Sequence, residues 1–407
     1  MKLDDAVPID KLIAPVRAYP SACLIGCGVL LRVVEYLGNR DLWMDETSLA
    51  EVIHFTPVSG FFGPLEKAQL APVGFLVIEH AANVLRDESA LALRLLPLLG
   101  GLLSLWLFHW LAERTLCPRS ALLALGIFVF SEDLIYFATE LKPYSTDVTI
   151  AILCLLMGAN VAQRRTATAR LAWLAPAPWF SFPSGFVLAG IGVVLFAAAL
   201  LEKERRRVFD LIGVGALWIF SSAGALWVAR RQLHQSPSMF AFWDFAFPEH
   251  SKGESGVQWA LRRFAYLFAN PLDFSIPGIG VTLPAVLALG LFLVGCVALG
   301  RRDSRTLGLL LAPLVFSMIA GYLRLYPFHG RLVLFLTPSL LILIAAGAGW
   351  IAERIGGRVA WGVMVGFLVV LPAISAGYYL IEMPRHRDFN PTGDRRPPTT
   401  VAKGFPF

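Results

Sequence analysis

Two acidic residues stand directly after the first long apolar segment, in the motif Trp43-Met44-Asp45-Glu46. A carboxylate held at a membrane surface could act as a general base or as a ligand for a divalent metal ion. The plainer interpretation is a tryptophan anchored at the interface and followed by solvated loop charges. Asp45 and Glu46 are therefore candidate catalytic residues, and the anchor interpretation stays open at this point.

A second group of charges lies at the junction of two apolar segments, where an unpaired charge is expensive to hold. It contains Glu140, Lys142 and Asp147. Pro143 predicts the start of a helix, because a helix leaves its first N–H groups unpaired and proline has none to lose. Tyr144 and Asp147 then fall in the first turn, where the helix dipole favours a carboxylate. The alternative is a buried Glu–Lys pair with a helix cap.

Two arginines, Arg324 and Arg331, flank a turn at 326–330 that holds Tyr326 and His329. The forked donor set of arginine suits a phosphate group, so these side chains could hold a lipid-linked phosphate. The alternative is that both arginines extend to lipid headgroups. His329 could be an acid or base in the reaction, or a hydrogen-bonding residue of the turn.

Two weaker candidates for substrate binding are Gln69, which could hydrogen-bond a substrate, and Arg94, which could pair with the acids or contact a phosphate. The chain has no phosphate-binding glycine loop, no dinucleotide motif and no Cys/His zinc spacing. Its 5 cysteines are scattered, without a disulfide or metal framework. We therefore expect no nucleotide-driven chemistry in this chain, and these motifs assign no cofactor.

Long apolar segments must position all of these residues. The chain has 407 residues, of which 57% are hydrophobic and only 16% charged, against about 25% charged in soluble domains. Segments of about 20 apolar residues are long enough for a helix to cross the bilayer core. No strand-like alternation appears, so the sequence predicts an all-helical, multi-pass membrane protein. The apolar segments lie at 18–37, 71–85, 91–111, 120–138, 144–162, 167–179, 183–201, 208–229, 281–300, 307–324, 331–350 and 359–380.

Clusters of arginine and lysine in the short loops indicate which side faces the cytoplasm. They lie near 164–170, 202–207, 301–305 and 354–358. Segment 71–85 spans only ~22 Å as a helix, which is short for a crossing, so we interpret it as a re-entrant or juxtamembrane helix on the outer face. About 11 spans (10 to 12) then remain.

This arrangement predicts a transmembrane domain at 1–383, with outer loops at 38–70 and 230–280, and a short, disordered extracytoplasmic tail at 384–407. All the candidate residues then face outward, where one common site is geometrically allowed. The formal net charge of +6 reflects these orienting loops, so the expected partner is the lipid bilayer and not nucleic acid.

The motifs also resemble a known class of enzyme. They follow one another in this order: Trp43-Met44-Asp45-Glu46, Gln69-Leu70-Ala71-Pro72-Val73-Gly74-Phe75, Ala92-Leu93-Arg94-Leu95-Leu96-Pro97, Glu140-Leu141-Lys142-Pro143-Tyr144 and Tyr326-Pro327-Phe328-His329-Gly330-Arg331. This order is similar to that of the GT-C fold membrane glycosyltransferases. Within this class, the order of motifs most resembles that of the bacterial family 39-like enzymes, which are related to protein O-mannosyltransferases and lipid A aminoarabinose transferases.

The resemblance implies transfer of a sugar from a polyprenyl-phosphate carrier to a lipid, glycan or protein acceptor, on the outer face of the bacterial inner membrane. It implies that Asp45 is the general base or a metal ligand, and that Glu140, or less surely Asp147, supports it. Any divalent metal would lie at Asp45 and Glu140. By position and chemistry, Lys142, Arg324 and Arg331 are the expected phosphate contacts.

The sequence departs from the class in two places. Gln69-Leu70-Ala71-Pro72 replaces a basic or His-containing Pro-Pro element, and the tail is too short for the soluble outer domain that relatives often carry. Two other functions stay open: a transporter or flippase of lipid-linked sugars, and a non-catalytic membrane subunit. Transporters often have inverted repeats and polar residues at the midplane, whereas here no repeat is evident and the acids lie at span ends.

Overall fold

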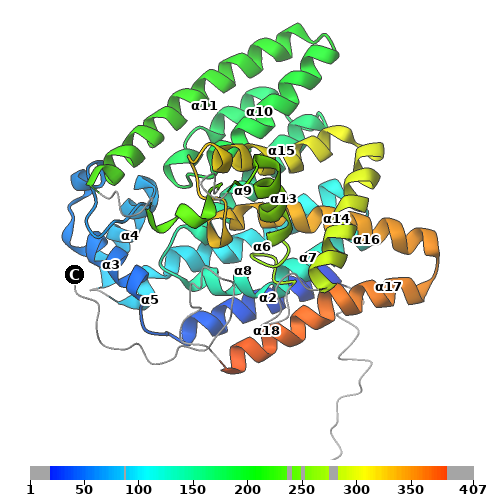
Figure 1. Ribbon diagram of the computed structural model, residues 1–407, viewed down its shortest axis with the longest axis horizontal. Coiled ribbons are helices and arrows are strands. Elements are labelled where there is room, and N and C mark those ends of the chain that lie inside the picture. Colours follow the sequence, from blue (N-terminus) through cyan, green and yellow to red (C-terminus); the bar gives the residue numbers. More distant parts are fainter. Residues whose placement is uncertain (1–18, 87–88, 236–240, 249–252, 275–282, 383–407) are drawn as a thin grey trace, which may run out of the picture.

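The computed structural model is a bundle of helices joined by turns (Figure 1). It describes residues 19–86, 89–235, 241–248, 253–274 and 283–382. Within these ranges, 9 helices are long and apolar enough to cross a membrane, or up to 10 if one bent pair forms a single crossing. The predicted all-helical, multi-pass architecture is confirmed. The tail predicted at 384–407 lies outside the described residues.

The helices of crossing length are of two kinds. Some are continuous: α2 (Pro20–Leu37), α9 (Tyr144–Ala162), α10 (Ser184–Leu201), α11 (Arg205–Gln232), α14 (Leu283–Arg302) and α15 (Ser304–Tyr322). Others join consecutive pieces: α5 (Ala90–Leu93) with α6 (Leu95–Thr115), η8 (Gly330–Leu336) with α16 (Thr337–Ile355), and α17 (Arg358–Val365) with η9 (Gly366–Val370) and α18 (Leu371–Glu382). The bent pair, at 58°, is α7 (Pro118–Phe130) followed by α8 (Glu132–Tyr136) and η2 (Phe137–Thr139).

The predicted span at 167–179 has a different structure. It forms two short 3₁₀ helices, η3 (Thr168–Leu174) and η4 (Ala177–Trp179). Pro176 and Pro178 remove two backbone donors from this stretch, which explains why no continuous α-helix forms. Without this segment, the described part of the chain has up to 10 helical crossings, which is the lower end of the predicted range of 10 to 12.

The same segment still connects the two ends of the bundle. It leaves the C-terminal end of α9 and ends just before α10, where the hydroxyl of Ser184 donates to the carbonyl of Ser181 at 2.6 Å. A 3₁₀ helix rises about 2 Å per residue against 1.5 Å in an α-helix, so few residues cover the distance.

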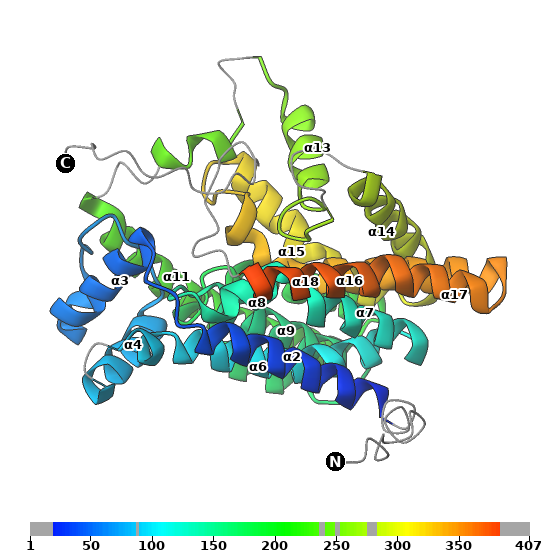
Figure 2. The same cartoon turned by 90° about the horizontal axis from the view of Figure 1, so that it is seen from below.

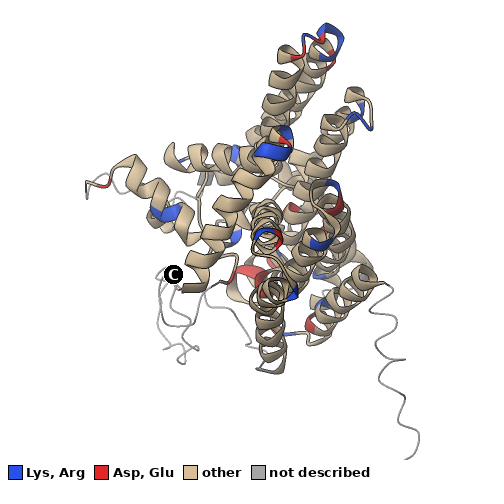
Figure 3. Cartoon of the chain, turned by 90° about the vertical axis from the view of Figure 1, so that its right-hand side faces the viewer, with Lys and Arg blue, Asp and Glu red and all other residues tan. Residues whose placement is uncertain are grey.

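The arginine-rich turns lie together at one end of the bundle, which we call the basic end. Arg164 donates a hydrogen bond to Glu202 at 2.7 Å, and Arg305 pairs with the same carboxylate. Gln163 donates to the carbonyl of Arg114 at 2.9 Å. Viewed from this side, Lys and Arg mark the tips of the helices (Figure 3). The basic end comprises the turns at 114–119, 163–170, 202–207, 301–305 and 353–358.

The opposite end, which we call the site end, carries α3 (Met44–Phe55), η1 (Val58–Phe62) and α4 (Val73–Arg86), at the left of Figures 1 and 2. The side chain of Gln232, at the end of α11, donates to the carbonyl of Phe61 at 2.9 Å. As predicted, α4 is an apolar helix that is too short to be one of the spans.

The core of the bundle is built around α16, whose apolar stretch is 94% buried inside the protein. Residues on every side of this helix are apolar, as expected for a helix surrounded by others. Gly295 of α14 and Gly347 of α16 let the two backbones touch, because a Cβ at either position would overlap a carbonyl of the facing helix. Close contact through small residues is a common way to pack membrane helices.

In the described part of the large outer loop, one helix packs on α15. This helix, α13 (Gly256–Tyr266), lays the fully buried Trp259 against Gly321 of α15. Two short turns, η5 (Leu233–Gln235) and η6 (Asp244–Ala246), precede it.

Candidate functional site

The site is a cluster of charged side chains from four segments of the site end. Asp45 lies in the first turn of α3, and Gln69 lies in the loop before α4. Glu140 and Lys142 lie in the turn before α9, and Arg331 lies in η8. These residues are far apart in the sequence, and the fold brings them within contact distance of one another.

Asp45 is held between two cations. Its Oδ1 accepts a hydrogen bond from Lys142 Nζ at 2.8 Å, and its Oδ2 accepts one from Arg331 Nη2 at 2.8 Å. Burial alone raises the pKa of this carboxyl, but the two cations outweigh burial and lower the pKa to about 2. Asp45 is therefore ionised at neutral pH.

Gln69 completes the arrangement around the lysine. Lys142 Nζ donates to Gln69 Oε1 at 2.7 Å, and Gln69 Nε2 lies 3.4 Å from Asp45 Oδ1. The two residues before it, Lys67 and Ala68, have φ of 53° and 51°, a region that residues with a Cβ seldom adopt. Backbone strain of this kind tends to occur at functional sites, and here it directs the amide toward the charges.

Glu140 lies beside the same cluster in a more enclosed position. Its side chain is 5% exposed and its Oε1 lies 3.6 Å from Arg331 Nη1. Burial raises the pKa of Glu140 to about 7, although Arg331 acts in the opposite direction. Burial also disfavours the charged form of Lys142, which for a cation lowers the pKa. The environment thus separates two carboxyls, one ionised and one that titrates near neutrality.

Glu46 lies behind the cluster and fastens the two loops that carry it. Its Oε1 accepts from Arg94 Nε at 3.0 Å and from the backbone N–H of Leu141 at 2.9 Å. Its Oε2 accepts from Arg94 Nη2 at 2.8 Å and from the N–H of Trp43 at 3.1 Å. Glu46 is fully buried and Arg94 nearly so. Glu46 was predicted to be catalytic and Arg94 to bind substrate, but in this arrangement both side chains position loops.

Three of the predicted substrate-binding residues lie on the α9 side of the cluster. The guanidinium of Arg331 lies over the ring of Tyr144, 5.3 Å from its centroid. Asp147 is buried in the first turn of α9. Tyr326 donates to the carbonyl of Leu332 at 2.7 Å, which fixes the start of η8 next to Arg331.

The two remaining candidates lie outside the cluster. Arg324 pairs with Asp244 and lies over the ring of Phe247 at 5.0 Å. The Nδ1 atom of His329 accepts a hydrogen bond from Arg263 Nη1 at 2.8 Å, and burial together with that arginine lowers the pKa of His329 to about 3. His329 is therefore uncharged at neutral pH.

One residue that sequence reasoning missed, Arg40, supports the site. Arg40 donates to Glu35 at 2.7 Å and to the hydroxyl of Thr139 at 2.9 Å, which ties the end of α2 to the turn that carries Glu140. A signal for this residue existed, because Glu35 lies in an apolar span and needs a nearby cation.

The two carboxylates named as metal ligands, Asp45 and Glu140, do not fit a divalent ion. Both oxygens of Asp45 accept from cationic side chains, and Glu140 faces one of the same cations. Divalent ions such as Ca²⁺ and Mg²⁺ require several oxygen ligands. In the described part of the chain, no group of three or more His, Cys, Asp or Glu side chains could hold a metal. We therefore assign no step of the reaction to a metal.

The fold is similar to that of a solved archaeal enzyme, the Archaeoglobus fulgidus oligosaccharyltransferase. Its apo structure matches with a TM-score of 0.55 at 13% identity, over 94% of this chain and 57% of that one. Its complex with Zn and sulfate matches with a TM-score of 0.55 at 13% identity, over 93% and 54%. A form tethered to an acceptor peptide gives 0.51 at 13% identity, over 95% and 57%.

No protein-family model and no curated protein sequence match the chain. At this level of identity the likeness to the oligosaccharyltransferase is one of fold. The chain spans 57% of the length of its apo structure. The protein thus has a helical membrane architecture similar to that of this enzyme, in agreement with the GT-C-like fold that we expected from its motifs.

Proposed function

We propose that this protein is a membrane glycosyltransferase that moves a sugar from a polyprenyl-phosphate donor to a hydroxyl group of a lipid, glycan or protein acceptor. One observation carries the proposal: an accessible carboxylate, Asp45, lies between two cations, Lys142 and Arg331, at one end of a membrane bundle. This set contains both a base for the acceptor and positive charge for a phosphate leaving group.

The two cations are suited to the donor's phosphate. Lys142 is buried and Arg331 has a side chain only 18% exposed, so water screens their charge poorly. A phosphate that leaves with the electron pair of the broken bond is stabilised by preorganised cations at this position. Arg331 provides a forked donor set and Lys142 a point charge.

Asp45 is the better placed of the two carboxyls to act as the base. Its side chain is 26% exposed, whereas that of Glu140 is 5% exposed, so an acceptor reaches Asp45 more readily. While both cations pair with it, the low pKa of Asp45 makes it a weak base. A donor phosphate competes for the same cations, and each contact that it takes from Asp45 raises that pKa. Donor binding therefore activates the base.

The transfer is a displacement at the anomeric carbon of the sugar. The acceptor oxygen forms a bond to that carbon while the bond from the carbon to the phosphate oxygen breaks. The hydroxyl proton passes to Asp45, and the negative charge on the departing polyprenyl phosphate is neutralised by Lys142 and Arg331. Glu140 holds the other side of Arg331 during this step.

The site would face away from the cytoplasm. The arginine-rich turns of the basic end favour the cytoplasmic side of a cytoplasmic membrane, which leaves Asp45 on the outer side.

The test uses the purified protein in proteoliposomes with a labelled polyprenyl-phosphate sugar and a hydroxyl acceptor. We expect Asp45→Asn to lower the transfer rate by ~10²–10⁴, the usual contribution of a general base. The matched control is Asp244→Asn. Asp244 is an exposed acid at the same end, and among the described residues it forms an ion pair only with the surface residue Arg324. It should transfer at the wild-type rate.

Full activity of Asp45→Asn would show that Asp45 is not the base. Movement of the donor across the liposome membrane without any transferred sugar would instead identify a flippase.

A further inference from the structure

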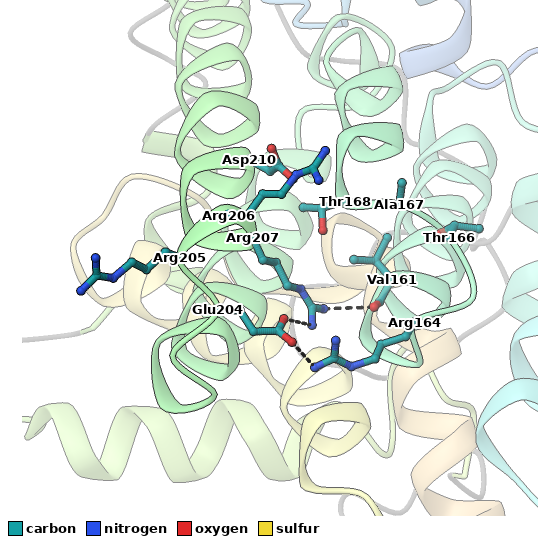
Figure 4. Close-up of a pocket in the computed structure, with 10 residues that line it drawn as sticks. All are labelled: Val161, Arg164, Thr166, Ala167, Thr168, Glu204, Arg205, Arg206, Arg207 and Asp210. Atoms are coloured by element: carbon teal, nitrogen blue, oxygen red, sulfur yellow. Dashed lines mark hydrogen bonds and ion pairs between the residues drawn. The ribbon is translucent and has the colours of Figure 1, made fainter.

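We propose that a cavity at the basic end binds the phosphate group of an anionic phospholipid. The cavity has a volume of about 460 Å³ and lies between the start of α11 and the turn after α9 (Figure 4). It is distant from the candidate active site, at the other end of the bundle, and the proposal does not depend on the glycosyltransferase function. Its polar lining consists mainly of Arg164, Thr166, Thr168, Arg206, Arg207 and Asp210.

The strongest evidence is a buried arginine with an unused donor. Arg207 is 8% exposed and donates from Nη2 to the carbonyl of Val161 at 3.0 Å. Its Nη1 lies 3.6 Å from Glu204 and 3.7 Å from Glu202, and neither Nη1 nor Nε has a hydrogen-bond partner among the described residues. A buried donor without a partner costs free energy, and an acceptor oxygen in the cavity would remove that cost.

The charge around the cavity favours an anion. Four arginines border it (Arg164, Arg205, Arg206 and Arg207), of which Arg205 points away from the others (Figure 4), against the two acids Glu204 and Asp210. Glu204 is already paired with Arg164 at 2.7 Å. Thr166 and Thr168 add hydroxyl donors. A phosphate has several acceptor oxygens and is well matched to guanidinium and hydroxyl donors.

The position of the cavity favours a lipid as the source of that phosphate. One turn beyond Arg206, α11 exposes Phe209 (71%) and Ile212 (52%), as expected of a helix that contacts lipid tails. The cavity therefore lies where the apolar part of α11 gives way to charge, at the level of the headgroups. Basic pockets between membrane helices commonly hold anionic headgroups at this level.

Charged loops alone have a simpler role, because they orient a membrane protein. That role requires neither a cavity nor a buried arginine with an unused donor. These two features are what the phosphate site adds.

The test is native mass spectrometry of the full-length protein with phosphatidylglycerol, with phosphatidylcholine as the neutral lipid. We expect the wild type to retain phosphatidylglycerol in preference. Arg206→Gln should weaken that binding about fivefold, the usual effect of one basic side chain at a charged membrane surface. Arg206 is exposed and forms no ion pair with another described residue. The variant should therefore keep the fold, and an unchanged melting temperature will verify this.

The matched control is Arg205→Gln, which removes the same charge from the adjacent residue. The side chain of Arg205 extends away from the other labelled residues (Figure 4), so its loss should change the affinity less than twofold. Equal losses in the two variants, or no preference for phosphatidylglycerol, would overturn the proposal. A third arm adds inorganic phosphate: if it binds as tightly as the lipid, the site takes phosphate from solution and the lipid assignment is wrong.

Discussion

The two ends of this bundle use charge in different ways. At the site end a network of largely buried ion pairs joins distant segments: Asp45 and Arg331 are 286 residues apart. At the basic end the pairs lie in short turns, and side chains such as Arg164 are 54% exposed. Exposed pairs are inexpensive and contribute little, whereas buried charges are costly unless fully paired. A buried ionic network in so apolar a chain therefore marks the region where function has constrained the sequence.

The largest expected effect concerns the pair beneath the site. Arg94→Met should destabilise the protein by ~3–5 kcal/mol, because it leaves the carboxylate of Glu46 buried without its cation. The double variant Arg94→Met/Glu46→Gln should recover much of that loss. Thermal unfolding in detergent measures both. The same change at the basic end, Arg164→Met, should leave the unfolding temperature unchanged, and a large loss there would contradict the contrast between the two ends.

The second prediction separates two arginines that flank one turn. Arg331→Gln should lower the transfer rate by ~10²–10³, the usual cost of losing a group that stabilises transition-state charge. Arg324→Gln should leave the rate within about twofold, because its side chain pairs on the surface with Asp244. Steady-state kinetics with the lipid-linked donor tests the pair. Equal losses would mean that Arg324 also reaches the donor.

The third prediction concerns the pH dependence of stability. Burial raises the pKa of Glu140 from 4.5 to about 7 in the folded protein, so the folded state binds more protons than the unfolded state between these values. Stability should therefore decrease as the pH rises through this window, by up to ~3 kcal/mol. Glu140→Gln should remove this dependence. Denaturant unfolding at pH 5 and at pH 7.5 measures how the free energy of unfolding of each protein changes with pH. An equal change in the two proteins would show that burial does not perturb the pKa of Glu140.

The smallest effect is expected at low pH. The pKa of Asp45 is lowered from 3.8 to about 2, so its pairing contributes stability above pH 3.8 that is lost as the pH falls toward 2. Because a quarter of the side chain is exposed, we expect ~1 kcal/mol at most after allowance for screening by water. Comparison of Asp45→Asn with wild type at pH 5 and pH 3 measures it; a variant that loses as much stability as wild type would contradict the pairing.

The sequence was sufficient to place Asp45, Glu140 and Lys142 in one region. Charge is rare and expensive in an apolar chain, and the basic turns determine which loops share an end. Pro143 also predicted the start of α9 correctly, since the helix begins at Tyr144.

Other features depend on tertiary structure. Asp45 and Glu46 are adjacent, but successive residues of a helix point about 100° apart, and only the packed fold shows which one faces Arg94. Arg324 and Arg331 are equivalent by sequence, and the turn between them sends one outward. The 3₁₀ structure at 167–179 depends on partners that appear later in the chain.

Those later partners impose an order on how the protein is made. The carbonyl of Leu171 accepts a hydrogen bond from Trp218 at 3.0 Å, and Trp179 donates to Ser221 at 3.0 Å. Both partners lie in α11, which the ribosome makes only after this segment. A stretch whose backbone lacks α-helical hydrogen bonds does not remain in lipid alone. We therefore expect this segment to become stable in the bilayer only together with the α10–α11 hairpin, as one unit and not as an independent span.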